Sequence, residues 1–131
     1  MMNLTNIVLN TTDKKKLSNY ISEIFDKQVS VVDNQYSINM DGINFLFKQV
    51  EGEKANQDSQ HTLLEFFVNS VEELEDLLKK VQFYHYRLNA GNKPGHFCEI
   101  PEIHGDQGIH YFEVEDTDHR KWKFSTLIGP S

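Results

Sequence analysis

Hydrophobic and polar positions follow two different periods in the first half of the chain. Residues 4–10 alternate as a β-strand does, and residues 14–25 carry apolar side chains at helical spacing directly after Asp13, a good helix cap. Period-two alternation then returns in three short segments, residues 29–31, 36–40 and 43–50. The last two are joined by Asp41-Gly42, which suits a hairpin turn. This half therefore predicts a β-α-β-β-β module.

The same order of elements is predicted after residue 60. Residues 61–68 alternate as a strand, and Ser70 with Glu73 matches a capping box at the start of a helix over residues 71–81. The remaining predicted elements are strands at 83–88 and 97–100, a turn at 105–108, and a closing hairpin that ends in Trp122-Lys123-Phe124. The second half thus repeats the first in the order of its elements, although no sequence identity links the two halves.

The polar segment 52–60 separates the two patterns and is predicted as an exposed linker. We therefore expect modules at approximately 1–51 and 61–131 within a single domain, 1–131. A domain of this size buries about two-thirds of its unfolded surface, so it needs neither a disulfide nor a structural metal to be stable.

Charge and cysteine content narrow the possible partners. The chain has 20 acidic and 13 basic residues, a formal net charge of -7, which disfavours nucleic acid and anionic membranes as partners. Cys98 is the single cysteine and cannot form an internal disulfide. No apolar run approaches the length of a membrane span. Because residues 1–6 lack the basic-then-apolar pattern of a secretory signal, we expect a cytoplasmic location.

The closing hairpin carries the most specific local signal. Its turn resembles the Asp-Pro-Asp-Gly-Asn pattern of the vicinal oxygen chelate superfamily, which includes glyoxalase I, fosfomycin and bleomycin resistance proteins, and extradiol dioxygenases. Thr117 and His119 replace the Pro and Gly of that pattern. The residues that match are Asp116 and Asp118 in the turn, Trp122 and Phe124 beside it, and Pro101 and Gly108 upstream. With the duplicated topology, the resemblance covers essentially the whole chain.

This resemblance implies an α+β fold in which two β-α-β-β-β modules form a curled mixed sheet around a cup, with the helices outside, and it implies a homodimer. Strand alternation then assigns side chains to the two faces. Phe112, Val114, Trp122 and Phe124 should pack toward the helix, while Leu63 and Ser125 should face the cup. The cup-facing residues predicted to bind a ligand are His61, Glu65, Phe67, Tyr111, Glu113, Lys121 and Lys123.

Metal-dependent relatives place His, Glu or Gln at about four inward positions, because these groups leave room for an oxygen-bearing substrate on a divalent ion. By resemblance, three of those positions fall on Asn6, Leu63 and Lys123. Asn is a poor ligand, Leu is none, and a protonated Lys repels a cation. We therefore expect no metal and no cofactor, although His61 and Glu65 flank Leu63 and offer a noncanonical pair.

The charged residues of this face allow two interpretations. Glu113 and Lys123 could simply pair across adjacent strands, which is worth about 0.2–1 kcal/mol. Alternatively, both charge signs together with Tyr111 and Phe67 could form the wall of a pocket for a polar aromatic or zwitterionic molecule.

Other conspicuous residues favour structural roles. The run Phe83-Tyr84-His85-Tyr86 is typical of an aromatic strand or a dimer contact, and it lacks the basic residues of a base-stacking surface. His96 and Cys98 could share a strand face, but no second pair completes a zinc site.

The leading hypothesis is a metal-independent protein of the glyoxalase/bleomycin-resistance kind that binds a small organic molecule in the sheet cup. The alternative is a metal-dependent lyase or transferase of the glyoxalase I or fosfomycin-resistance type. A third possibility is that the fold serves assembly alone. No catalytic acid, base or nucleophile can be assigned, so the sequence leaves open whether the chain is an enzyme.

Overall fold

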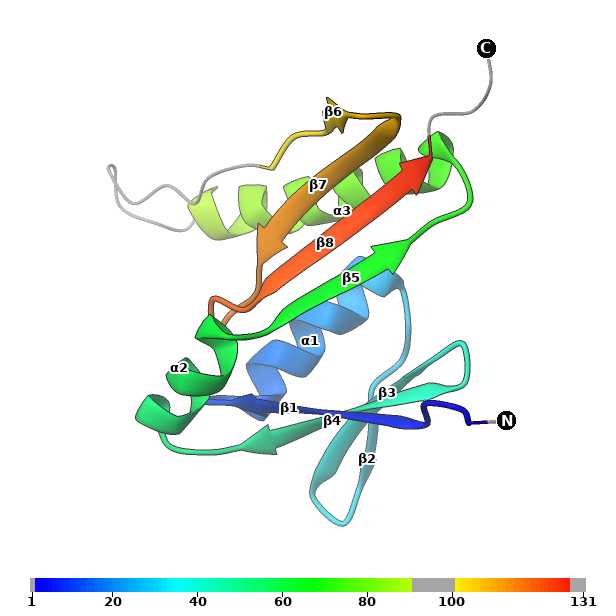
Figure 1. Ribbon diagram of the computed structural model, residues 1–131. Coiled ribbons are helices and arrows are strands. Elements are labelled where there is room, and N and C mark those ends of the chain that lie inside the picture. The colour runs from blue at the N-terminus through cyan, green and yellow to red at the C-terminus, as the bar shows by residue number, and fades with distance from the viewer. Residues whose placement is uncertain (1, 91–100, 128–131) are drawn as a thin grey trace. The chain divides into compact units, whose positions relative to one another are not determined.

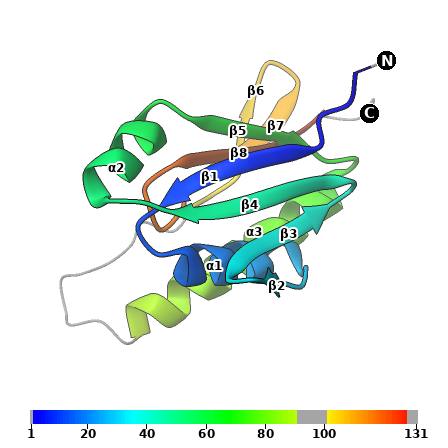
Figure 2. The same cartoon turned by 90° about the horizontal axis from the view of Figure 1, so that it is seen from below.

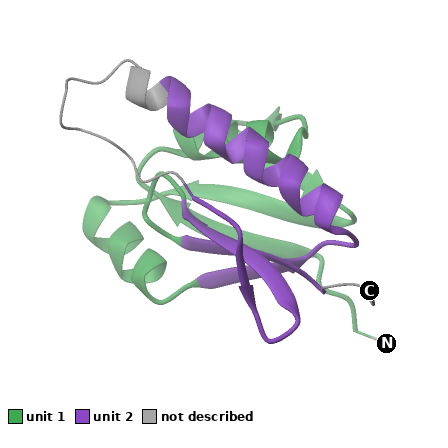
Figure 3. Ribbon diagram, turned by 90° about the horizontal axis from the view of Figure 1, so that it is seen from above, with its two compact units in different colours: residues 1–62, 116–120 green, residues 63–115, 121–131 purple. Residues whose placement is uncertain are grey.

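The computed structural model describes residues 2–90 and 101–127. Over these residues the chain has the predicted α+β architecture, with two four-stranded mixed sheets. It divides into two compact units, residues 1–62 with 116–120 and residues 63–115 with 121–131 (Figure 3). The turn of the closing hairpin thus belongs to the first unit, whereas its strands belong to the second. The predicted cup between the modules and the predicted homodimer stay predictions.

The first unit has the predicted β-α-β-β-β order followed by a second helix. In chain order its elements are β1 (Asn6–Thr11), α1 (Lys14–Phe25), β2 (Ser30–Val32), β3 (Gln35–Met40), β4 (Ile43–Gln49) and α2 (Gly52–Gln60). The strands lie in the order β1-β4-β3-β2, with β1 and β4 parallel and the other pairs antiparallel. Figure 2 shows β1, β4 and β3 side by side, with α1 against one face of the sheet.

Local chemistry fixes the ends of α1. The Asp13 side chain accepts a hydrogen bond from the Lys16 backbone N–H at 3.1 Å, as expected of a helix cap. The helix ends at Asp26, whose φ of 53° is left-handed. Between these two ends, one face of α1 packs against one face of the sheet, and both faces are buried. The core of this unit contains Leu9, Leu17, Tyr20, Ile21, Ile24, Ile38, Met40, Phe45 and Phe47.

The segment 52–60, predicted as an exposed linker, forms a helix that the sequence pattern did not indicate. Most of its side chains are exposed, but Ala55 and Ser59, one turn apart, are buried, and the helix packs against β1. A stripe of two small residues gives almost no hydrophobic periodicity, and this is why the sequence pattern did not indicate a helix.

The second unit repeats the order of the first. Its elements are β5 (Leu63–Phe67), α3 (Val71–Ala90), β6 (His104–Asp106), β7 (Ile109–Glu115) and β8 (Lys121–Leu127). The strands lie in the order β5-β8-β7-β6, with β5 and β8 parallel. Helix α3 packs against β7 and β8 (Figure 1). None of the described helices combines the length and the apolar character needed to cross a membrane.

Helix α3 begins as predicted and continues further than predicted. The Ser70 hydroxyl accepts from the Glu73 N–H at 3.1 Å, and the Glu73 carboxylate accepts from the Asn69 N–H at 3.0 Å. The capping box therefore forms, but the Glu73 carboxylate bonds the N–H of Asn69, the residue before the cap, in place of the N–H of Ser70 itself. The predicted strand at 83–88 was wrong, because His85 lies one turn after Val81 and is buried with it. The predicted strand at 97–100, with His96 and Cys98, lies outside the described residues.

The face of the second sheet toward α3 is apolar, as strand alternation predicted. Phe112, Val114, Trp122 and Phe124 are all buried. The rings of Trp122 and Phe124 stack with that of Phe66, at centroid distances of 5.8 Å and 5.5 Å. This packing holds β5, β7 and β8 in fixed register and directs the intervening side chains to the opposite face.

Candidate functional site

The face of the second sheet that points away from α3 brings six of the seven predicted site residues together. The register places Glu65 of β5 and Glu113 of β7 opposite Lys123 of β8. One row along, Leu63 and Glu115 lie opposite Lys121. One row in the other direction, Phe67 and Tyr111 lie opposite Ser125. We call these three rows the open face.

Lys123 contacts an aromatic ring, and within residues 2–90 and 101–127 it forms no ion pair. Its ammonium Nζ lies 4.7 Å from the centroid of the Tyr111 ring, within the range of a cation–π contact. Among the described residues, the side chains of Glu65 and Glu113 form no ion pair or hydrogen bond. The simple Glu113–Lys123 pair that the sequence allowed is therefore not the observed arrangement.

The end of the open face beyond Lys123 is aromatic and apolar. Phe67 is 62% exposed and Leu127 is 67% exposed. The His104 ring lies 5.6 Å from the Tyr111 ring, centroid to centroid. Ser125 is 1% exposed, and its hydroxyl has no hydrogen-bond partner in the part of the chain that the structure describes. This end thus combines apolar surface with an unsatisfied polar group.

His61 does not belong to the open face. It follows α2 in the first unit, and its backbone N–H donates to carbonyls in the last turn of that helix, including that of Asp58 at 3.3 Å. Strand β5 begins two residues later, at Leu63. The prediction that His61 is part of the strand was wrong, because its backbone N–H is hydrogen-bonded at the end of α2.

The positions that resemble the metal ligands of the superfamily hold unsuitable groups. Asn6 lies on β1, where its amide donates weakly to the Thr5 hydroxyl at 3.4 Å. In the second unit, Leu63 offers no lone pair, and Lys123 places an ammonium between two carboxylates. Within residues 2–90 and 101–127, no three His, Cys, Asp or Glu side chains are grouped as metal ligands would be. Lys123 therefore carries an ammonium, which cannot ligate a metal ion, where the resemblance leads us to expect a metal-binding acid.

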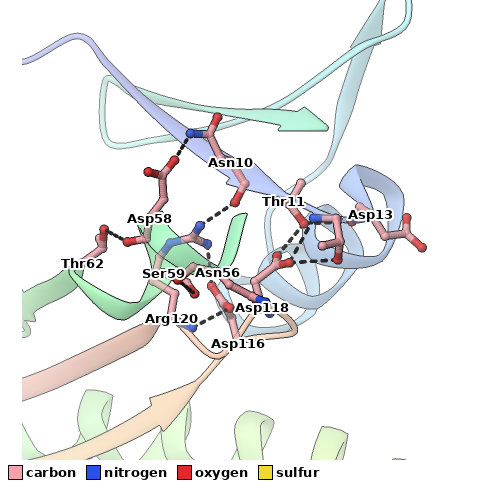
Figure 4. A network of polar contacts seen from close by, with 11 residues as sticks. Asn10, Thr11, Asp13, Asn56, Asp58, Ser59, Thr62, Asp116, Asp118 and Arg120 are labelled. Atoms are coloured by element: carbon pink, nitrogen blue, oxygen red, sulfur yellow. Dashed lines mark hydrogen bonds and ion pairs between the residues drawn. The ribbon is translucent and has the colours of Figure 1, made fainter. Parts of the chain in front are cut away.

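A buried polar network that was not predicted surrounds the hairpin turn in the first unit (Figure 4). Arg120 is 1% exposed, and its guanidinium donates to the Asp116 carboxylate at 2.9 Å and to the Asn10 carbonyl at 2.6 Å. Such pairs are stable only when each charge is fully hydrogen-bonded. Asn10 and Arg120 are 110 residues apart in sequence, so no local pattern indicates this contact.

Asp118 completes the same network. It accepts hydrogen bonds from the Thr11 hydroxyl and, at 3.0 Å each, from the backbone N–H and the hydroxyl of Thr12. The two aspartates that marked the superfamily resemblance thus attach the hairpin turn to the end of β1. Because their oxygens are engaged by the chain itself, this network is structural.

The fold described above is shared by solved structures, among them a glyoxalase/bleomycin resistance protein/dioxygenase family enzyme. No protein-family model matches the sequence, and no curated protein matches it. Solved structures match over nearly the whole chain.

A glyoxalase/bleomycin resistance protein/dioxygenase family enzyme from Burkholderia phytofirmans PsJN aligns with a TM-score of 0.63 at 13% identity, covering 96% of this chain and 99% of that one. The oxidase ChaP-H2 aligns with a TM-score of 0.65 at 16% identity, covering 98% of both chains. A hypothetical protein from S. aureus aligns with a TM-score of 0.65 at 15% identity, covering 97% and 98%. These likenesses establish the fold that the closing hairpin predicted.

Proposed function

We propose that the protein binds a small organic molecule, polar aromatic or zwitterionic, on the open face of its second sheet and without a metal ion. The observation that carries the proposal is the row Glu65–Lys123–Glu113, in which two carboxylates flank an ammonium without pairing with it. An ion pair within the row would have satisfied these groups. Their arrangement leaves both charge signs accessible beside exposed aromatic surface.

The apolar side chains of the open face supply the affinity. Phe67 and Leu63 are 62% and 53% exposed, and Leu127, one row beyond Ser125 on the same side of the sheet, is 67% exposed. Full burial of one such side chain is worth about 1.5–3 kcal/mol. The charged row adds orientation and specificity, since exposed pairs contribute about 0–1 kcal/mol each.

The experiment compares two phenylalanines of equal exposure. Phe67 on the open face and Phe83 on the outer side of α3 are each 62% exposed. We expect Phe67→Ala to weaken binding of an aromatic probe by about tenfold, because about 1.4 kcal/mol of apolar contact is lost. Phe83→Ala should leave binding unchanged. The measurement is isothermal titration with 2-phenylethylammonium, L-tryptophan and 3-phenylpropionate in buffer containing EDTA.

The metal-dependent alternative predicts a different outcome from the same protein. A lyase or transferase of that kind would bind probes only after a metal is supplied, and Ni, Zn or Mn would raise its Tm stoichiometrically. Binding that requires added metal, or equal losses in Phe67→Ala and Phe83→Ala, would contradict the proposal.

A further inference from the structure

We propose that the group recognised by the open face is an organic cation, and that the Lys123 ammonium holds the position on the Tyr111 ring that the ligand's cation takes. This inference rests on the proposed function and names the chemistry of its ligand. Three independent features of the second unit carry it: the contact of Lys123 with Tyr111, the charge of the open face, and the hydroxyl of Ser125.

The first feature is a cation already placed on an aromatic ring. Lys123 Nζ lies 4.7 Å from the Tyr111 centroid, although two carboxylates lie opposite Lys123 in the neighbouring strands. The ring face is therefore a position that favours positive charge in this surrounding. A ligand ammonium brought to the same ring would meet the same favourable potential, with Glu65 and Glu113 on either side.

The second feature is the net charge of the open face. Its three rows contain three carboxylates (Glu65, Glu113 and Glu115) and two ammonium groups (Lys121 and Lys123), which leaves one negative charge. Such a surface attracts cations and repels anions over the Debye length. The charge would be fully compensated by one bound monocation.

Lys123 can leave the ring at little cost. Its strand register already places it opposite Glu65 and Glu113, so a displaced ammonium gains a cross-strand pair. A cation–π contact and a cross-strand ion pair at an exposed site are of comparable size. Moving the Lys123 ammonium off the ring therefore changes the free energy of the protein little. The ligand's own contacts with the open face then determine whether it binds.

The third feature is the buried hydroxyl of Ser125. It lies in the same row as Tyr111 and Phe67, is 1% exposed, and has no hydrogen-bond partner among the described residues. A buried hydroxyl without a partner costs free energy, and a ligand N–H that displaces the atoms covering it would recover part of that cost. This favours primary or secondary ammonium ions, which have N–H donors, over quaternary ions, which have none.

The test removes the resident cation and asks whether binding improves. Lys123→Met keeps the length of the side chain and removes its charge, and Lys80→Met removes a charge from the outer side of α3 as the matched control. Titrations at pH 8 would use 2-phenylethylammonium, tetramethylammonium and 3-phenylpropionate. We expect Lys123→Met to bind 2-phenylethylammonium about two- to fivefold more tightly than the wild type, because Met neither competes for the Tyr111 ring nor repels the ligand ammonium.

The controls separate this inference from the proposed function. Lys80→Met should bind like the wild type, and tetramethylammonium should bind more weakly than 2-phenylethylammonium in each protein. If 3-phenylpropionate binds the wild type and loses affinity in Lys123→Met, the open face binds an organic anion, so the proposed function stands and this inference falls. If no probe binds any of the proteins, both fall. Lys123→Gln provides the same comparison should Lys123→Met fail to fold.

Discussion

At the scale of single residues, the hairpin turn departs from the Asp-Pro-Asp-Gly-Asn pattern that it resembles and still forms a turn. The loop Thr117–His119 closes with a hydrogen bond from the His119 N–H to the Asp116 carbonyl at 2.9 Å. His119 has a φ of 64°, the left-handed conformation that a glycine adopts freely. The chain therefore keeps the backbone of the turn with a residue that tolerates it only moderately.

This turn gives a stability prediction at one position. His119→Gly should raise the free energy of unfolding by about 0.5–1 kcal/mol, because it removes the cost of a side chain at positive φ. His119→Val should lower it by about 1–2 kcal/mol, because a β-branched residue is strained there. Urea unfolding followed by circular dichroism measures both. Equal effects of the two substitutions would mean that the loop relaxes to another turn type.

Strand alternation predicted which residues of the site share a face, but it could not predict the contacts that their side chains make. Alternation placed Glu65, Lys123 and Glu113 on one face correctly, because period two is a property of any strand. It could not show that Lys123 contacts Tyr111 in preference to a carboxylate, since that depends on side-chain packing. The burial of Arg120 was equally out of reach, because its partner Asn10 comes from the far end of the chain.

At the scale of elements, helix boundaries were predictable where the apolar stripe was strong. Helix α1 has the predicted bounds because Leu17, Ile21 and Ile24 form a clear stripe after a good cap. Helix α2 was missed because its buried stripe is Ala55 and Ser59. The predicted helix over residues 71–81 is shorter than α3 because the aromatic run that follows it favours a strand by local propensity. In the structure the helix continues through this run because its inner face is buried.

Helix α3 carries a pH-sensitive residue on that inner face. Burial lowers the pKa of His85 from the ordinary value of 6.5 because desolvation disfavours the imidazolium. The unfolded chain therefore binds a proton at a higher pH than the folded chain does. The contribution of neutral His85 to the free energy of unfolding is complete above about pH 7.5. It declines as the pH falls through 6.5 toward the lowered pKa of the folded state.

The free energy of unfolding of the wild type should decrease between about pH 7.5 and 5.5, and His85→Gln should show a shallower decrease. His61→Gln serves as the control, because His61 is exposed and its removal should leave the wild-type slope unchanged. Urea titrations at a series of pH values give the slopes. A slope in His85→Gln as steep as that of the wild type would assign the acid sensitivity to other groups.

At the scale of the whole molecule, the comparisons establish the fold and leave the chemistry to the side chains. Two modules with the same strand order give the glyoxalase-like fold, and solved structures at 13–16% identity share it. The fold alone does not determine function, which depends on the side chains of the site. In this chain, the open face of the second sheet holds Lys123 where a metal-binding acid would be expected by resemblance.

The central claim is that the open face binds a small organic molecule without a metal. Its most direct test is an NMR titration of the ¹⁵N-labelled protein with 2-phenylethylammonium in the presence of EDTA. We predict saturable shifts concentrated in β5, β7 and β8, with the largest at the amides of Glu65, Glu113 and Lys123. Saturable shifts elsewhere in the chain, or shifts on the open face that appear only after a divalent metal is added, would contradict the account.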